Sequence, residues 1–277
     1  AVVELKARFD EEQNINWAEE LERAGVNVVY GFAGLKIHAK LCLVVRREPK
    51  GMRRYAHIGT GNYNASSAKI YTDLGLFTAR DDICSDVQDL FNVMTGFGVI
   101  DNYRRIFVSP NHLRANITRL IREEAEIHRA KGGGRIIMKC NQLVDQGIVR
   151  ELYEASRAGV KIECVVRGIC SLRPGIKNVS ETISVHSIVG ELLEHARIYY
   201  FEHGGEPVMY VGSADMMTRN LNGRIEVLTP VLDKKLMDNI LKQIVNPQLA
   251  DNTHAWELLS DGSYKKIKRE AGAVAMD

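Results

Sequence analysis

The chain alternates between two patterns of hydrophobic and polar residues over its first 130 or so positions. One pattern is amphipathic with helical spacing and predicts helices over 14–24 and 84–94. Ser109 followed by Pro110 has the features of a helix start, with Ser as the N-cap, and predicts a helix that runs to about Ala130. The other pattern consists of short apolar runs, which predict strands at 1–8, 26–30, 35–45, 54–58 and 74–78.

The same alternation continues after Gly132, Gly133 and Gly134, which are the best candidate for a domain boundary. We therefore expect a first domain over 1–131 and a second over 132–277. Helices are predicted over 145–158 and 233–245, and a hairpin is predicted to turn at Asp261-Gly262. Strand-like segments of the second domain lie at 135–140, 160–166, 183–189, 196–201, 207–212 and 225–231. Strands that alternate with helices indicate an α/β fold with a mixed sheet in each half.

The two halves also repeat each other, in five matching segments that occur in the same order. The first-half segments VVELKAR, VNVVYG, LKIHAKLCLV, RYAHIGTGNYN and YTDLGLFT match KIECVVR, ISVHSIVG, LLEHARIYYF, PVMYVGSADMMTRN and GRIEVLTP of the second half. Five ordered matches favour an internal repeat over two unrelated domains. The sequence therefore predicts two copies of one unit, related by pseudo-twofold symmetry.

The repeat places a histidine and a cation at equivalent positions of both halves. Because side chains alternate along a strand, His38 and Lys40 share one face, and so do His195 and Arg197. Two such faces brought together make a pocket that suits in-line phosphoryl transfer: one histidine attacks phosphorus and the other supplies or removes a proton. These four residues are the candidate catalytic residues. His57 has no histidine counterpart in the second half, and its role stays open.

Further polar residues recur around each histidine. Arg8 and Arg167 end equivalent strands, where a guanidinium can bind phosphate oxygens in pairs. The runs G-T-G-N, which ends at Asn62, and G-S-A-D contain glycines that allow backbone N–H groups to approach phosphate. Asp73 and Glu226 are each expected to hold the second ring nitrogen of the histidine in their own half.

Composition and charge narrow the class of partner. The 277 residues are 45% hydrophobic and 26% charged, and no apolar run is long enough to predict a membrane span. The net charge of only +2 argues against a nucleic-acid binder, so any anion site is expected to be local. Five cysteines without a C-x-x-C pair are expected to be reduced core residues of a cytoplasmic protein. Peripheral association with a membrane is left open.

The start of the chain suggests a fragment of a longer protein. The chain opens inside an apolar run rather than on Met. In the second half, the segment 135–158 precedes the strand that ends at Arg167, whereas nothing equivalent precedes the first strand. We therefore expect a first half with an unpaired sheet edge, or one completed by another chain.

The paired motifs resemble the phospholipase D superfamily, whose repeated unit carries H-x-K-x4-D and G-S-x-N. The chain departs from that pattern at Val45, which replaces the Asp, and at Arg197, which replaces the second Lys. A closer resemblance, over essentially the whole chain, is to the polyphosphate kinase family. This resemblance is carried by the runs ELKARFDEE, GLKIHAKL, RYAHIGTGNYN, YTD, SADMMTRN and RIEV.

The resemblance implies the C-terminal catalytic part of such a kinase, built from two phospholipase D-like domains. His38 matches the phosphohistidine nucleophile of the family, and His195 matches a second catalytic histidine that contacts ATP. Tyr71 and Arg167 match nucleotide-binding residues. Asn62, at the end of the G-T-G-N run, is expected to be a further nucleotide-binding residue. Arg8 matches an arginine of the magnesium–phosphate site, where we expect it to bind metal-bound phosphate because arginine is a poor metal ligand.

The implied reaction moves the terminal phosphoryl group of ATP reversibly to polyphosphate through phospho-His38, with Mg²⁺ and ATP/ADP bound. The resemblance also implies a homo-oligomer for the full-length protein. Two alternatives stay open, a phospholipase D-like phosphodiesterase and an inactive polyanion-binding fragment. Transfer of phosphate from ATP to the protein separates the kinase from the phosphodiesterase.

Overall fold

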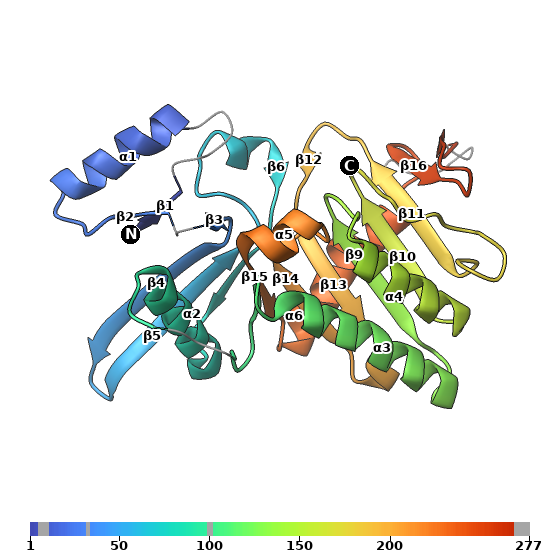
Figure 1. Ribbon diagram of the computed structural model, residues 1–277, viewed down its shortest axis with the longest axis horizontal. Helices are drawn as coiled ribbons and strands as arrows, with labels where there is room; N and C mark the ends of the chain where they lie inside the picture. The colour runs from blue at the N-terminus through green and yellow to red at the C-terminus, as the bar shows by residue number, and fades with distance from the viewer. Residues whose placement is uncertain (5–10, 32–33, 99–101, 269–277) are drawn as a thin grey trace.

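The first half of the chain contains a three-stranded antiparallel sheet and one helix packed on it (Figure 1). The computed structural model describes residues 1–4, 11–31, 34–98 and 102–268. The strand order is β4-β5-β7, with bounds Lys40–Glu48, Gly51–Gly59 and Gly75–Thr78. Helix α2, Asp81–Met94, buries its apolar stripe against Ala56 and Ile58 of this sheet.

A smaller group of elements lies beside this sheet. Strands β1 (Val2–Val3) and β2 (Val29–Tyr30) form a parallel pair next to helix α1, Glu11–Arg23 (Figure 1). A 3₁₀ turn, η1 (Ser67–Lys69), precedes β6 (Tyr71–Thr72). Strand β6 leaves the first half and pairs with the second.

The second half is built on a ten-stranded mixed sheet. Its order is β17-β16-β11-β10-β9-β13-β14-β15-β3, and β8 also pairs with β15. The bounds are β3 Lys36–Ile37, β8 Phe107–Ser109, β9 Arg135–Cys140, β10 Lys161–Val166, β11 Ile183–Ile188, β13 Arg197–Phe201, β14 Val208–Gly212, β15 Arg224–Pro230, β16 Ala255–Leu258 and β17 Tyr264–Lys266. Strand β12, Leu193–Glu194, lies outside this sheet and pairs with β6.

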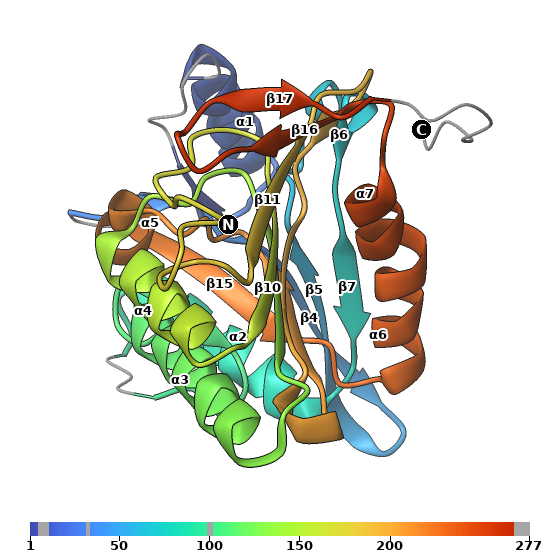
Figure 2. The ribbon, with the colours of Figure 1, turned by 90° about the vertical axis from the view of Figure 1, so that its right-hand side faces the viewer.

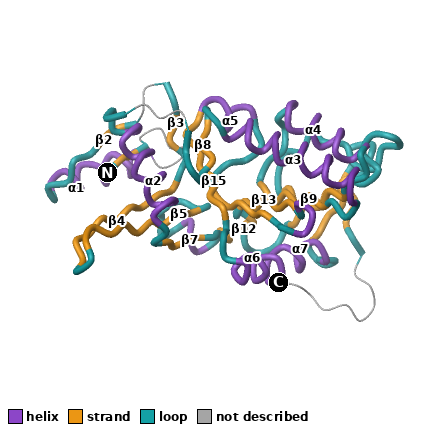
Figure 3. The backbone as a smooth tube through the Cα atoms, turned by 90° about the horizontal axis from the view of Figure 1, so that it is seen from below, coloured by secondary structure: helices purple, strands orange, loops and turns teal. Residues whose placement is uncertain are grey.

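Helices cover both faces of the large sheet, as Figures 2 and 3 show. Helices α3 (Leu113–Lys131) and α4 (Gln146–Arg157) lie on one face. On the other face lie α6 (Lys234–Ile240), the π-helical turn η3 (Leu241–Val245) and α7 (Asn246–Ala250). Two short elements, η2 (His203–Gly205) and α5 (Thr218–Gly223), connect strands.

This layering explains the continuous apolar runs of the second half. Along β9, Ile136 and Met138 pack toward α3 and α4, while Ile137 packs toward α6. All three side chains are fully buried. A strand that is covered on both faces needs apolar residues at every position rather than at alternate ones. The predicted α/β fold with a mixed sheet and flanking helices is confirmed for the second half, whereas the described strands of the first half form an antiparallel sheet and a separate parallel pair.

Two short parallel pairings join the halves, and each is the repeat equivalent of the other. Strand β3 pairs with β15 through Lys36↔Arg224 and Ile37↔Ile225. Strand β12 pairs with β6 through Leu193↔Tyr71 and Glu194↔Thr72. In the aligned repeat, β3 corresponds to β12 and β15 corresponds to β6 with its following residues. The structure therefore has the expected pseudo-twofold relation, with its axis at the junction of the halves.

Three local predictions differ from the structure. The strand expected over 35–45 is broken at His38, because the N–H groups of His38 and Ala39 both donate to the carbonyl of Ile225, at 3.0 and 2.9 Å. The helix expected from Ser109 begins at Leu113 instead, since Ser109 ends β8 and its hydroxyl donates to the carbonyl of Arg224 at 2.8 Å. Cys42, expected in the core, is exposed on β4.

Helix α3 belongs by packing to the second half. Its Ile117 and Ile121 are buried in the same apolar cluster as Met138 and Phe201 of the large sheet. Strand β8 likewise joins that sheet through β15. The packing thus changes from one half to the other before the three glycines: Ile106 and Val108 still pack with α2, whereas Phe107 and α3 pack with the large sheet.

Strand β4 bonds β5 on one side and no described strand on its other side. The equivalent strand of the second half, β13, lies between β14 and β9. Among the described residues, β4 is therefore an edge strand, in agreement with the unpaired edge that the repeat led us to expect. None of the helices in the described ranges combines the length and the apolar character needed to cross a membrane.

Candidate active site

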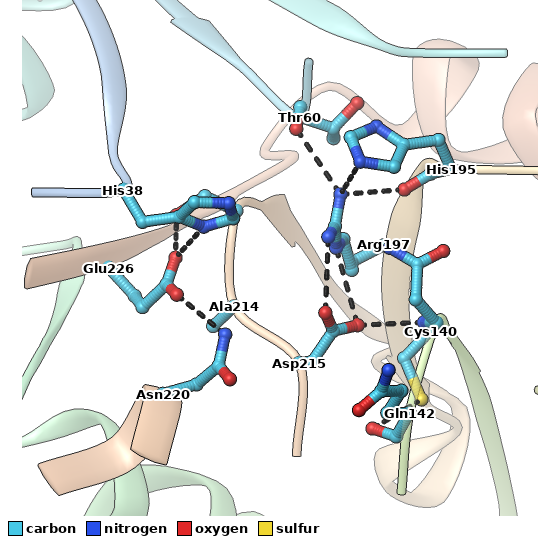
Figure 4. Close-up of polar contacts among 12 residues, drawn as sticks. His38, Thr60, Cys140, Gln142, His195, Arg197, Ala214, Asp215, Asn220 and Glu226 are labelled. Carbon is cyan, nitrogen blue, oxygen red and sulfur yellow. Dashed lines mark hydrogen bonds and ion pairs between the residues drawn. The ribbon is translucent and has the colours of Figure 1, made fainter. Parts of the chain in front are cut away.

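His38 lies at the junction of the halves, between β3 and β4. The break in the strand turns its imidazole toward Glu226 of β15, and His38 Nδ1 lies 2.8 Å from Glu226 Oε2 (Figure 4). The Glu226 side chain is fully buried, with an exposed fraction of 0%. It also accepts hydrogen bonds from the Ser213 hydroxyl at 2.5 Å and the Asn220 amide at 2.6 Å. Glu226 is therefore a fixed acceptor, and His38 donates to it from Nδ1.

His195 is held in the equivalent way by the first half. Its Nδ1 lies 2.8 Å from Asp73 Oδ1, and the same oxygen accepts from the Thr60 hydroxyl at 2.6 Å. Thr60 is the repeat equivalent of Ser213. The Asp73 side chain is 24% exposed, so this carboxylate is less enclosed than Glu226.

The acid partners are crossed between the halves, which corrects the expectation that each acid holds the histidine of its own half. Glu226 of the second half holds His38, and Asp73 of the first half holds His195. The reason is the exchange of short strands: β15 lies beside β3, and β6 lies beside β12. Glu226 lies in β15 itself, and Asp73 directly follows β6. Neither half supplies both members of the His38–Glu226 pair or of the His195–Asp73 pair.

The two repeat cations differ in what they contact. Arg197 Nη1 donates to the carbonyl of His195 at 2.8 Å and lies 3.1 Å from His195 Nε2. The guanidinium also binds both oxygens of Asp215, at 3.3 and 3.1 Å (Figure 4). Lys40 donates to the carbonyl of His38, just as Arg197 donates to the carbonyl of His195. No described residue contacts His38 Nε2 by a hydrogen bond, so this nitrogen stays open.

Burial changes the protonation of these groups. Burial lowers the pKa of His38 and of His195, while their carboxylate partners oppose that change. Burial lowers the pKa of Lys40 to about 7. Burial alone would raise the pKa of Glu226, but the surrounding positive charge and hydrogen-bond donors lower it overall. At neutral pH the site therefore holds neutral imidazoles against an ionised carboxylate.

Several site residues were not found by sequence reasoning. Asn141 accepts from Arg167 Nε at 3.1 Å through its side chain, and its N–H donates to Asp215 Oδ1 at 2.7 Å. Asn220 holds Glu226, as described above. Arg224 is partly buried and forms no side-chain hydrogen bond or ion pair with any described residue. The one sequence signal for Arg224 is its place two residues before Glu226 in a predicted strand, because side chains two apart on a strand share a face.

The other predicted site residues fall at different places. The Tyr71 ring lies against His195, with 4.8 Å between ring centroids. Asn62 is exposed, whereas its repeat equivalent Asp215 is buried against Arg197. Arg8 lies outside the described residues.

His57 is on the sheet face that α2 does not cover. Its Nδ1 lies 2.7 Å from the Tyr63 hydroxyl, and its ring packs against Phe77. The structure does not bring His57 into contact with His38 or His195. Its contacts are those of a residue that shapes an exposed aromatic cluster.

The carboxylates of the site do not fit a resident Mg²⁺ ion. Asp73, Asp215 and Glu226 already accept hydrogen bonds from histidine, arginine or hydroxyl donors. Over the ranges that the structure describes, no group of three or more His, Cys, Asp or Glu side chains could hold a metal ion. Mg²⁺ prefers oxygen ligands and commonly keeps substrate phosphates among them. The described residues therefore do not form a site of three or more protein ligands for Mg²⁺.

Comparison with known proteins defines the class to which this arrangement belongs. A model of polyphosphate kinase C-terminal domain 1 matches residues 1–100, and a model of C-terminal domain 2 matches residues 106–276. The chain therefore consists of two consecutive C-terminal kinase domains. It belongs to the polyphosphate kinase family.

Individual relatives agree with this assignment. The chain is 52% identical over 273 residues to polyphosphate kinase 1 of Chlorobaculum tepidum, covering 99% of the chain and 39% of that protein. It is 54% identical over 264 residues to polyphosphate kinase of Synechocystis sp., covering 95% of the chain and 36% of that protein. The crystal structure of polyphosphate kinase from Porphyromonas gingivalis superposes with a TM-score of 0.90 at 37% identity, over 100% of this chain and 42% of that one. The chain thus spans about two fifths of the length of the relatives that it matches.

Proposed function

We propose that this chain carries the catalytic centre for reversible transfer of the terminal phosphoryl group of ATP to polyphosphate, through a phosphohistidine at His38. The observation that carries the proposal is the state of the His38 ring. Its Nδ1 is tied to the buried carboxylate of Glu226 at 2.8 Å, and no described residue occupies its Nε2. A neutral imidazole fixed in this way presents a lone pair at Nε2, which is what a nucleophile needs.

The surroundings of His38 suit a transferred phosphoryl group. Lys40, Arg167 and Arg197 bring positive charge to the junction of the halves. Charge in the transition state spreads over three phosphoryl oxygens, and preorganised cations stabilise it. In the first step the bond from phosphorus to His38 Nε2 forms as the bond to the ADP oxygen breaks. In the second step a terminal polyphosphate oxygen attacks phosphorus and the bond to Nε2 breaks.

His195 is proposed as the proton-handling residue on the nucleotide side. Its Nε2 faces Arg197 Nη1 at 3.1 Å, so the neutral ring accepts a hydrogen bond from the guanidinium. A phosphate group would offer Arg197 another acceptor and would favour the protonated imidazole. His195 Nε2–H could then donate to the same anion. Tyr71, whose ring lies against His195, is proposed to contact the nucleotide.

The remaining parts of the proposal come from the family resemblance. They are ATP and ADP as substrates, Mg²⁺ bound with the nucleotide phosphates, and nucleotide contacts by Arg167 and Asn62. They also include phosphate binding by Arg8, a cytoplasmic location, and a homo-oligomer for the full-length protein. Neither a nucleic-acid partner nor a phosphodiesterase reaction is proposed.

The direct test is transfer of radiolabel from the terminal phosphate of ATP to the protein, with magnesium present. We expect label that is stable to base and labile to acid, and we expect His38→Ala to lose it. His203→Ala is a control, because His203 is a histidine on the distant turn η2. Label that persists in His38→Ala would contradict the proposal.

If the wild-type chain is folded but takes up no label, a second measurement is needed. The same assay is then run on a longer protein that spans the full length of the relatives. Label on the longer protein would mean that segments outside this chain are needed for ATP. No label on either protein would favour the phosphodiesterase, which is then tested with a phosphodiester substrate.

A further inference from the structure

A cavity of about 390 Å³ lies at the end of the large sheet that is farther from the two histidines. It is bounded by the segment 102–107, the first turns of α3, the first residues of β14 and the last residue of β15. The histidine site uses the opposite ends of the same strands, because Glu226 lies near the start of β15 and Pro230 ends it. At about 3.3 Å per residue, these two positions are about 13 Å apart.

The wall of this cavity is positively charged. No aspartate or glutamate is among the described residues that line it, whereas four of them are cations: Arg104, Arg105, Arg119 and Lys234. Each cation also pairs with a carboxylate that does not line the cavity. These carboxylates belong to Asp82, Asp86, Asp89, Glu123 and Glu206. The cations are therefore partly compensated, but only from outside the cavity.

The ion pairs leave several guanidinium donors available. Arg105 binds Asp82 through Nε, at 2.9 Å, and its Nη groups form no hydrogen bond with a described residue. Arg119 binds Glu123 through Nη1, at 2.8 Å, and its Nη2 has only a 3.5 Å contact with the side chain of Asn116. A guanidinium has five N–H donors and can bind phosphate oxygens in pairs. Both arginines can therefore bind an anion without giving up their carboxylates.

Tyr210 lies where these two arginines converge. Burial raises the pKa of its hydroxyl and the charges of Arg119 and Arg105 oppose that change, so both guanidiniums lie near it. Its ring stacks on Phe107, with 4.3 Å between the ring centroids. The Tyr210 hydroxyl has no hydrogen-bond partner among the described residues, and neither has the buried Nε2 of His112, which lines the same cavity. Polar atoms in such positions usually have a partner, which a ligand can supply.

We propose that this cavity is a second binding site, separate from the histidine pair, for a nucleoside phosphate. Arg105 and Arg119 bind its phosphate oxygens, and the Tyr210 hydroxyl donates a further hydrogen bond to them. Apolar residues of the same wall, among them Val208 and Leu232, contact the base and the sugar. The volume of about 390 Å³ lies in the range of small-molecule sites. A polyphosphate chain has no apolar part and would leave the apolar wall without a partner.

The site goes beyond the phosphoryl transfer proposed above and does not depend on it. Its wall contains the segment 102–106, which connects the two halves. The wall also contains Pro230, in the same strand as Glu226, which holds His38. A nucleotide in this cavity therefore contacts both the connection between the halves and the strand that holds His38.

The test is photoaffinity labelling of the chain with 8-azido-ADP, a light-activated analogue of ADP, at low salt and below half saturation. Mass spectrometry of the peptides then locates the label. We expect label within 102–119, 207–210 or 230–237, the segments that line the cavity. An excess of ADP should remove this label. Pyrophosphate at the same concentration should remove much less of it, because pyrophosphate has neither base nor sugar.

Arg105→Gln and Arg119→Gln should each lower the labelling of these segments about tenfold, the usual scale for one charged hydrogen bond. Arg122→Gln is the matched control, because Arg122 lies on the same helix as Arg119, pairs with Glu151 and does not line the cavity. It should change the labelling by less than about twofold. The Arg105 and Arg119 side chains are 47% and 51% exposed, so both variants should fold, and their melting temperatures are measured as a check.

Three results would overturn the proposal. They are absence of label from these segments, equal labelling in the wild type and in both arginine variants, and removal of the label by pyrophosphate as effectively as by ADP. Phosphorylation of His38 from ATP is measured separately. If His38 is phosphorylated but the cavity takes no photolabel, only the second site is refuted. If the cavity is photolabelled but His38 is never phosphorylated, only the function proposed above is refuted.

Discussion

Arg197 makes the two histidines chemically different, although they occupy equivalent positions of the repeat. A lysine at this position, as in Lys40, reaches only the histidine carbonyl. The planar guanidinium reaches the carbonyl, the ring nitrogen of His195 and both oxygens of Asp215. Because arginine stands in the second repeat where the first has lysine, the Nε2 atom of His195 contacts Arg197. The Nε2 atom of His38 has no hydrogen-bond partner among the described residues.

The first prediction concerns Glu226. Glu226→Gln removes the carboxylate that fixes the His38 tautomer, and the new amide nitrogen would face either the Asn220 donor or the His38 and Ser213 donors. We expect phosphorylation of His38 to slow about 100-fold or more, by analogy with other histidines that lose their carboxylate. The rate is measured by rapid quench with labelled ATP.

Glu206→Gln is the matched control, because Glu206 is 80% exposed and pairs only with a surface lysine. It is expected to label at the wild-type rate. If the Glu226→Gln protein is folded and is also phosphorylated at the wild-type rate, the role given to Glu226 is refuted.

The second prediction concerns Lys40, whose pKa is lowered to about 7 by burial. At about pH 8 the free site holds mostly neutral Lys40, and a bound polyanion favours its charged form. Binding of polyphosphate should then take up protons, which is detected by calorimetry in two buffers of different ionisation heat. Lys40→Met should take up fewer protons than wild type, and equal uptake would contradict this account. For the same reason, wild-type affinity should fall as pH rises through about 7.

At the scale of elements, local patterns sufficed where an element depends on its own sequence. The helix at α4 and the hairpin β16–β17, with Gly262 at a φ of 89°, were predicted because their periodicity and turn residues are local. Strands β3, β6 and β12 have two residues each and exist because the other half pairs with them. No local pattern encodes that pairing, and the crossed acids were missed for the same reason.

The site residues follow the same division. His38, His195, Lys40 and Arg197 were found because the repeat aligns them. Arg224 was missed, because its equivalent in the strand register is Tyr71, which the aligned segments do not place opposite it and which differs from it chemically. A repeat alignment thus finds the chemistry that the two halves share and overlooks the residues that make them different.

The third prediction concerns the segment that connects the two halves. Asp86 of α2 is fully buried and accepts from the N–H groups of Arg104, Arg105 and Ile106, at 2.9, 2.6 and 3.1 Å. Asp86→Ala would leave these donors without a partner and is expected to cost about 3 kcal/mol. The melting temperature should fall by about 6–12 °C.

Asp81→Ala is the control, because Asp81 is 83% exposed where it pairs with Arg54. An exposed ion pair of this kind contributes about 0–1 kcal/mol. Equal shifts for the two variants would contradict the role given to Asp86.

At the scale of the whole molecule, the halves form one catalytic unit. Each histidine is completed by a carboxylate from the other half, and the two crossing strand pairs hold these contacts in place. The net charge is only +2, so attraction for a polyanion must come from the cations gathered at the junction and not from the surface as a whole.

The fourth prediction follows from this local charge. Polyphosphate affinity of the wild-type chain should fall as salt concentration rises, because ions screen the attraction. Lys40→Met should show a weaker dependence, while Arg47→Gln, which removes a charge from the hairpin end of β4, should follow the wild type. Binding isotherms at several salt concentrations measure the three dependences. Salt-insensitive binding by the wild type would argue against a basic pocket.

The most direct test of the central claim is to identify the phosphorylated atom. Protein labelled from ATP is analysed by phosphorus NMR and by mass spectrometry of its peptides at alkaline pH, where phosphohistidine persists. Because Glu226 holds His38 Nδ1, the account predicts phosphate on Nε2 of His38. Phosphate on Nδ1 of His38, or on any other residue of the chain, would contradict it.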